Sequence, residues 1–126
     1  MTPILVETQG LKRYFKTPYG KLHAVDGIDL KIEKGKTLGV VGESGCGKST
    51  LGRALLKITK ITGGKVIYDG EDITRLNPIQ MRRYRTRMQM IFQDPYSSIN
   101  PRMTVRQLIA EPILINRKLR TRNDIN

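Results

Sequence analysis

The chain has 126 residues, fewer than an average domain, so it supports at most one hydrophobic core. Its hydrophobic fraction of 38% and charged fraction of 27% suit a globular chain better than a disordered one. Its apolar runs are far shorter than the roughly 18 to 20 residues of a membrane span. The single cysteine, Cys46, excludes an internal disulfide, and together with the single histidine, His23, it excludes a zinc cluster.

The net charge of +12 comes from 23 basic and 11 acidic residues, and it attracts polyanions such as nucleic acid, acidic lipid or nucleotide phosphates. Two basic blocks, residues 82–87 and 117–122, carry much of this charge. Each block also fits a solvated helix face or a chain end. No basic segment leading into an apolar one opens the sequence, so we expect a cytosolic chain without a secretory signal.

Residues 4–15 are rich in β-favouring side chains, and residues 24–32 alternate apolar with polar side chains. They predict two antiparallel strands joined by the turn chemistry of residues 16–21. The short apolar run at residues 37–41 predicts a central strand covered on both faces. Later elements are expected in this order: a helix at 49–60 that ends before 62–64, a strand at 65–68 with a turn at 69–70, a basic helix at 78–87, a strand at 88–92, and a helix from 104 that is interrupted or restarted at Pro112.

The strongest signal is a glycine, four residues and then Gly-Lys-Ser, between an apolar run and an amphipathic helix. Glycines let the backbone approach a phosphate closely, and the helix start adds its positive end. Lys48 would reach the β- and γ-phosphates, and the Ser49 hydroxyl would bind magnesium. The predicted ligand is a magnesium nucleotide, held by Gly42, Glu43, Ser44, Gly45, Cys46, Gly47, Lys48, Ser49 and Thr50.

A phosphate-binding loop does not identify the base, because kinases, GTPases, helicases and transporters share it. The guanine-reading pattern Asn-Lys-x-Asp is absent from this sequence, so ATP is preferred over GTP. Cys46 lies in the loop but has no visible base partner, so we expect it to contribute its backbone amide rather than a catalytic thiol.

The loop followed by Leu51, Gly52 and Arg53, and the segment MQMIFQDPYSSINPRMTV at residues 88–105, resemble the ATPase subunits of dipeptide and oligopeptide importers among the ATP-binding cassette transporters. The resemblance covers about residues 5–114 and is greatest to the second of the two ATPases in those permeases. It implies an α/β fold, with a P-loop NTPase core and an N-terminal antiparallel β-subdomain, truncated before the helical subdomain is complete. The implied boundaries are 1–36 for the antiparallel part, 37–100 for the core and 101–126 for the start of the helical subdomain.

The resemblance also assigns roles to residues. Gln93 matches the Q-loop glutamine, which would complete the magnesium and water environment at the γ-phosphate, so Lys48 and Gln93 are the catalytic candidates and Ser49 and Gln93 the metal candidates. Phe15 best matches the aromatic residue that stacks on adenine, with Tyr14 and Tyr19 as rivals. Phe15 also fits ordinary strand packing.

The sequence departs from the family in three features: a Leu-Ser-Gly-Gly-Gln-like signature, an apolar strand ending in Asp-Glu, and a switch histidine are not found in it. Without the acid and the signature, we expect this chain to bind MgATP but not to hydrolyse it efficiently. We also expect exposed apolar surface, and a truncated gene product or a partial sequence.

The expected partners are separate membrane permease subunits, a second and different ATPase subunit, and indirectly a substrate-binding protein. This places the chain on the cytoplasmic face of the membrane as a peripheral subunit. The transported compound is not readable, because it is the membrane subunits that select it.

Two alternatives remain open. The charge of +12 would also suit a basic nucleic-acid-associated module with a vestigial loop, although aromatic residues make up only 6% of the chain and tryptophan is absent. A small nucleoside or metabolite kinase is the other alternative, but no lid arginine motif or acidic strand end supports it.

Overall fold

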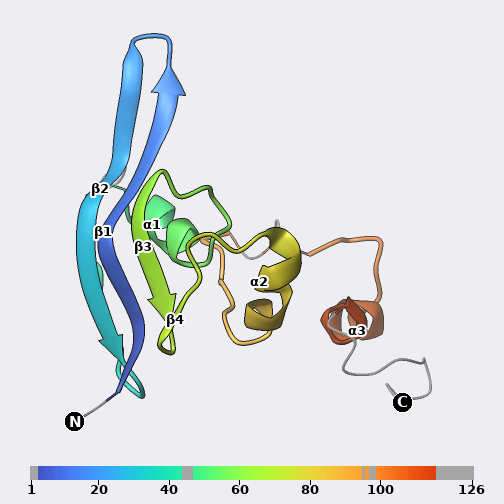
Figure 1. The fold of residues 1–126 in the computed structure, drawn as a ribbon. Coiled ribbons are helices and arrows are strands. Elements are labelled where there is room, and N and C mark those ends of the chain that lie inside the picture. Colours follow the sequence, from blue (N-terminus) through green and yellow to red (C-terminus); the bar gives the residue numbers. More distant parts are fainter. Residues whose placement is uncertain (1–2, 44–46, 95, 97–98, 116–126) are drawn as a thin grey trace. The chain divides into compact units, whose positions relative to one another are not determined.

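The computed structural model describes residues 3–43, 47–94, 96 and 99–115. The chain divides into two compact units, Met1–Met88 and Gln89–Asn126. The first unit contains a four-stranded antiparallel sheet with strand order β2-β1-β3-β4 and two helices, and the second contains helix α3 (Figure 1).

Strands β1 (Ile4–Thr17) and β2 (Gly20–Glu33) form the predicted antiparallel hairpin, and both are longer than expected. The register shifts between Thr8 and Leu11 and again between Arg13 and Tyr14. At the first shift, the buried Thr8 hydroxyl donates to the Ile28 carbonyl at 2.9 Å and accepts the Leu30 amide at 3.0 Å. The shift in register leaves the Ile28 carbonyl and the Leu30 amide without the usual backbone partners across the two strands. The Thr8 hydroxyl takes the place of those partners.

Strand β3 (Gly63–Tyr68) pairs with β1, and the short strand β4 (Glu71–Asp72) pairs with β3 after the turn at residues 69–70. The β3 strand and its turn confirm the sequence prediction, whereas β4 was not predicted. Gly64 has a φ of 78°, and a Cβ on it would lie 2.2 Å from the Gly10 carbonyl oxygen. Glycine is therefore required where β3 first approaches β1.

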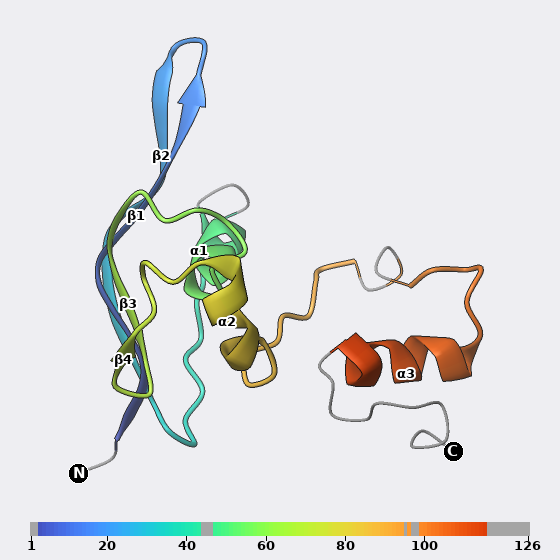
Figure 2. The ribbon, with the colours of Figure 1, turned by 45° about the vertical axis from the view of Figure 1, so that its right-hand side comes forward.

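Helices α1 (Lys48–Leu55) and α2 (Pro78–Arg85) lie on one face of the sheet (Figure 2). Helix α2 begins at a capping box, in which the Asn77 side chain accepts the Gln80 amide and the Gln80 side chain accepts the Asn77 amide. The core combines apolar side chains from the sheet, the loops and both helices. It contains Leu11, Val25, Val66, Tyr68, Ala54, Ile73, Met81 and Tyr84.

The prediction that α1 continues to residue 60 was wrong. The helix ends at Leu55 because Lys57 adopts a left-handed φ of 53°, and the Lys57 and Ile58 amides bond back to the Ala54 and Arg53 carbonyls at 3.0 and 2.9 Å. This is a Schellman-type end with lysine in the place that glycine usually takes. Tertiary contacts hold it in place.

Two of those contacts come from outside α1. The Lys57 ammonium donates to the Leu76 carbonyl. The Arg85 guanidinium of α2 donates to the Leu56 carbonyl and, at 3.2 Å, to the Lys57 carbonyl. The carbonyl groups at the end of α1 are thus bonded by α2, which is why the chain leaves the helix there rather than at the glycines.

The predicted strands at residues 37–41 and 88–92 were wrong, since neither segment forms a strand in the described part of the chain. Val41 is 94% exposed and Ile91 is 92% exposed, so these runs are not covered as central strands would be. A parallel strand exists only through bonds to a neighbouring strand, and all the described pairings join β1, β2, β3 and β4. Apolar composition alone does not supply that partner.

In the second unit, α3 spans Val105–Ile115. It also begins with a capping arrangement, because the Thr104 hydroxyl accepts the Gln107 amide at 3.2 Å and the Gln107 side chain accepts the Thr104 amide at 2.8 Å. The helix continues through Pro112, which corrects the expectation of an interruption at that residue.

Candidate functional site

The glycine-rich loop (residues 42–50) leads into α1 through Gly47, whose φ of 97° and ψ of 5° are left-handed. A Cβ at this residue would lie 2.3 Å from the Ala24 carbonyl oxygen of β2. Both the conformation and the close approach require glycine. The end of the loop is therefore fixed against strand β2.

The start of α1 has the electrostatic character of an anion site. Within the described residues, no side chain caps it and its first turn has no acidic residue. The amides of a first helical turn have no partner inside the helix, and they carry the positive end of the helix dipole. An anion placed there would be stabilised by both effects.

Lys48 is the first residue of α1, and its side chain is exposed. Its ammonium donates a hydrogen bond to the carbonyl of Gly42, the first residue of the loop. The positive charge thus lies across the loop between its two ends. Of the other predicted loop residues, Glu43 and Ser49 are exposed and Thr50 is half-buried, while Ser44, Gly45 and Cys46 lie outside the described residues.

Phe15 lies on the face of the sheet that α1 covers. Its neighbour two residues back, Arg13, pairs directly with Val25, which is buried in the core beside Ala54 of α1. Side chains opposite one another, and those two residues apart on a strand, share a face of the sheet. The Arg13 guanidinium lies over the Phe15 ring, 4.0 Å from its centroid, which confirms that the two share this face.

Tyr14 lies on the opposite face. Its ring stacks on His23 with centroids 3.9 Å apart, and its hydroxyl donates to Asp26. That hydrogen bond lowers the pKa of the Asp26 carboxyl and raises the pKa of the Tyr14 hydroxyl. Tyr19 is fully exposed in the hairpin turn. Of the three aromatic candidates, Phe15 is the one on the α1 face.

The register places Phe15 near the loop. Ala24, which Gly47 touches, lies between His23 and Val25, the partners of Tyr14 and Arg13, and Phe15 pairs with Leu22. Two positions along a strand and one step across the ladder amount to about 8 to 9 Å. One small ligand could therefore contact both the Phe15 ring and the end of the loop at Gly47.

Gln93 is exposed and belongs to the second unit, whereas Ser49 belongs to the first. Their predicted joint role at a magnesium ion therefore stays a prediction. Among the described residues, no group of three His, Cys, Asp or Glu side chains could hold a metal ion by itself.

The basic block at residues 82–87 is partly used inside the first unit. Arg83 pairs with Glu71 at 3.1 Å, and Arg85 binds the carbonyls at the end of α1. The block at 117–122 lies outside the described residues. A groove of about 560 Å³ in the first unit is lined in part by Lys12, Lys16 and Lys21, a concentration of charge that the sequence did not reveal because the three lysines are spread along the hairpin.

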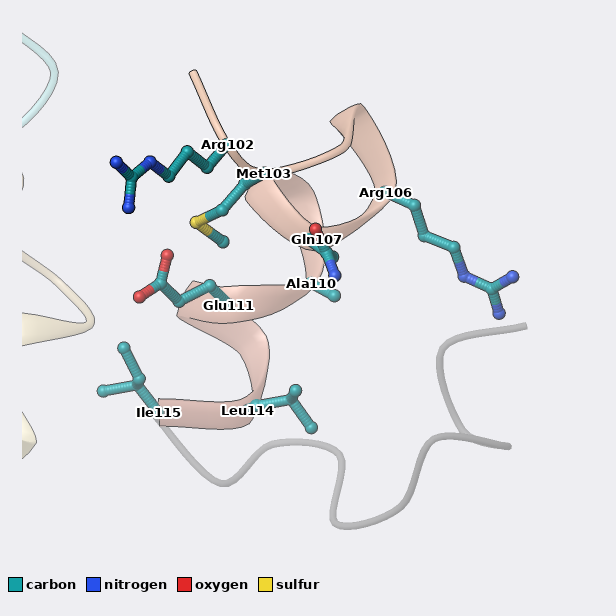
Figure 3. Close-up of a pocket in the computed structure, with 8 residues that line it drawn as sticks. All are labelled: Arg102, Met103, Arg106, Gln107, Ala110, Glu111, Leu114 and Ile115. Carbon is teal, nitrogen blue, oxygen red and sulfur yellow. The ribbon is translucent and has the colours of Figure 1, made fainter. Parts of the chain in front are cut away.

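The second unit has a hollow of about 780 Å³ along α3 (Figure 3). Its apolar lining comes from Met103, Ala110, Leu114 and Ile115, and its polar lining from Arg102, Arg106, Gln107 and Glu111. Two arginines and one carboxylate therefore share this hollow, whereas the first turn of α1 has no acidic residue among the described residues.

In the described part of the chain, no helix is long and apolar enough to span a membrane. Residues 25–125 match the family model described as ABC transporter. The chain is 46% identical to the oligopeptide transport ATP-binding protein OppF of Bacillus subtilis over 98% of its own length and 41% of that protein. It is 44% identical to the dipeptide transport ATP-binding protein DppF of Escherichia coli, over 91% of its own length and 36% of that protein.

The fold is shared with a solved structure, the dimeric MJ0796, a bacterial ABC transporter cassette. The TM-score is 0.81 at 20% sequence identity, over 96% of this chain and 52% of that one. The chain thus spans well under half of each curated relative and about half of the solved cassette. The matched family model and the shared fold lead to one conclusion: this chain belongs to the ABC transporter family and has the fold of its ATP-binding domain.

Proposed function

We propose that this chain binds MgATP through the glycine-rich loop and forms part of the ATP-binding subunit of a peptide importer. The observation that carries the proposal is the junction of loop and helix, where left-handed Gly47 and the Lys48 ammonium meet the uncapped start of α1. The names of the relatives, which are oligopeptide and dipeptide transport proteins, support the choice of importer.

Each residue of the loop has a separate task in this proposal. The amides at the start of α1 bind phosphate oxygens, and Lys48 exchanges its bond to the Gly42 carbonyl for the β- and γ-phosphates. Ser49, exposed next to it, supplies a hydroxyl to Mg²⁺, and Gln93 is a further candidate ligand on the strength of its match to the Q-loop glutamine alone. Amides, an ammonium and a hydroxyl are the donor set that a magnesium polyphosphate requires.

Phe15 stacks on the adenine ring. Its position on the α1 face, about 8 to 9 Å from the point where Gly47 meets β2, supports it over Tyr14 and Tyr19. Tyr14 is already engaged by His23 and Asp26 on the other face. Stacking on an aromatic ring would add base-specific affinity to the charge-based affinity for the phosphates.

Bound ATP supplies the phosphoanhydride bond whose hydrolysis drives transport. We limit the proposal for this chain to binding, the step that the loop and the start of α1 support. Membrane permease subunits and a second, different ATPase would complete the transporter, with a substrate-binding protein acting indirectly. This would place the chain on the cytoplasmic face of the membrane, as a peripheral subunit.

The proposal is tested by titrating MgATP into the purified 126-residue chain and into Lys48→Ala in a calorimeter. We expect saturable binding, and at least a tenfold loss of affinity in Lys48→Ala, because a hydrogen bond to a charged group contributes about 1.5 to 3 kcal/mol.

Lys60→Ala is the matched control, because Lys60 is exposed beyond the end of α1 and its substitution removes the same charge. Equal affinities of Lys48→Ala and Lys60→Ala would contradict the proposal. So would the absence of saturable heat at millimolar MgATP with folded protein.

A further inference from the structure

Arg13 is a cation whose surroundings are unusual for its charge. It lies on the α1 face of the sheet, and its Nε atom is buried without a hydrogen-bond partner among the described residues. Within the described residues, no carboxylate forms an ion pair with it. Its Nη1 atom donates a hydrogen bond to the Tyr14 carbonyl at 3.3 Å, and its guanidinium stacks on the Phe15 ring. Arginine side chains at such sites are normally paired with an acid.

The stacking has a geometric consequence for Phe15. With the guanidinium 4.0 Å from the ring centroid, one face of the ring is covered. Turning the ring about its side-chain bonds would break this cation–π contact, so the guanidinium fixes the plane of the ring. A second flat group would have to stack on the opposite face of the ring.

We propose that Arg13 is a positioning residue for the nucleotide base. It holds the Phe15 ring from one side, so that the ring presents its other face to the base. This inference rests on the proposed function, in which Phe15 stacks on adenine, and adds the residue that sets the strength of the stacking. Arg13 acts through Phe15, without contact to the phosphates.

The experiment compares two ligands, MgATP and magnesium tripolyphosphate, by calorimetry on the 126-residue chain. Tripolyphosphate carries the charge of ATP but has no base, so the ratio of the two affinities reports on the base alone. Arg13→Met keeps an unbranched side chain about as long as the aliphatic part of arginine and removes the charged, planar guanidinium. We expect Arg13→Met to weaken MgATP binding about fivefold and to leave tripolyphosphate binding unchanged.

Three further variants separate positioning from a structural role. Arg13→Lys keeps the charge without the flat guanidinium, and we expect an intermediate ratio. In a Phe15→Leu background, Arg13→Met should change the ratio no further, because the ring through which it acts is gone. Arg82→Met removes an exposed arginine on α2 and should leave both affinities unchanged.

Other outcomes overturn the inference. Equal losses for both ligands would mean that Arg13 binds phosphate, and tighter MgATP binding in Arg13→Met would mean that Arg13 competes with the base. An unchanged ratio, with both ligands bound by the unmodified chain, would remove the inference and leave the proposed function intact. Failure of the folded chain to bind either ligand would remove both.

Discussion

The two units of the chain differ in what their apolar side chains contact. In the first unit, side chains from three strands and both helices form one core, with Leu11 and Ile73 fully buried. In the described part of the second unit, Ala110 is the buried residue, while Val105 and Ile109 of α3 are largely exposed. The comparison shows that a capped helix can form from local signals, whereas a core needs strands that approach from distant parts of the sequence.

The largest expected effect is the difference in unfolding free energy between truncating an apolar side chain in the first unit and truncating one in the second. Leu11→Ala should lower the free energy of unfolding by about 3 kcal/mol, because it leaves a cavity in the core. Ile109→Ala, at a residue that is 63% exposed, should change it by less than about 0.5 kcal/mol. Urea denaturation followed by circular dichroism measures both, and comparable losses would contradict this difference in burial between the two units.

A second pair of variants tests how tightly the sheet of the first unit is specified. Gly64 and Gly70 both have positive φ, but a Cβ at Gly64 would meet the Gly10 backbone, whereas one at Gly70 would meet nothing within 4 Å. Gly70→Ala should cost about 1 kcal/mol for backbone strain alone. Gly64→Ala should cost clearly more in the same urea experiment, and equal costs would show that β3 can shift away from β1.

Removing the cap of α2 or that of α3 should give a smaller loss of stability, and each loss should be confined to the unit that contains the helix. Asn77→Ala should lower the unfolding free energy of the first unit by about 1 kcal/mol, since α2 contributes the buried Met81 and Tyr84. Thr104→Ala should reduce the helical signal of α3 and leave unfolding of the first unit unchanged, as monitored by hydrogen exchange of β1 amides. A loss of β1 protection in Thr104→Ala would show that the units fold together.

The smallest effect concerns acid. The pKa of Asp26 is lowered chiefly by the Tyr14 hydroxyl, that of Asp69 by Lys34, and that of Asp72 by Thr74. A carboxyl whose folded pKa is depressed stabilises the fold above its unfolded pKa of about 3.9, and this contribution is lost as the pH falls through the folded value. Tyr14→Phe should therefore raise the Asp26 pKa, measured by carboxyl NMR titration, and leave that of Asp72 in place.

The sequence predicted elements whose signals are local. The hairpin follows from alternation and turn residues, the helix at 78 from a proline near its first turn, and the helix from 104 from the spacing of its apolar side chains. The end of α1 could not be predicted, because Lys57 is held in a left-handed conformation by groups from residues 76 and 85. The predictions of strands at 37–41 and 88–92 were wrong for a similar reason, because a strand forms only when a distant segment pairs with it.

The loop residues of the candidate site were predicted from the spacing of the pattern and from its place between an apolar run and an amphipathic helix. The family resemblance preferred Phe15 over Tyr14 and Tyr19, but the face that each side chain takes could not be predicted, because the register shift between Arg13 and Tyr14 is not visible in the sequence. The role proposed for Arg13 was missed for the same reason. An arginine two residues before an aromatic residue on a predicted strand is a weak signal that becomes useful only when the face is known.

The contact between Gly47 and Ala24 bears on how glycine patterns are interpreted. Two demands of the folded chain, a left-handed backbone and a carbonyl oxygen in the space of a methyl group, select glycine at this position before any ligand arrives. Retention of this glycine in another chain would therefore report on folding as much as on nucleotide binding. Neither demand applies to the neighbouring Lys48. Retention of that lysine is therefore the better indicator of nucleotide binding.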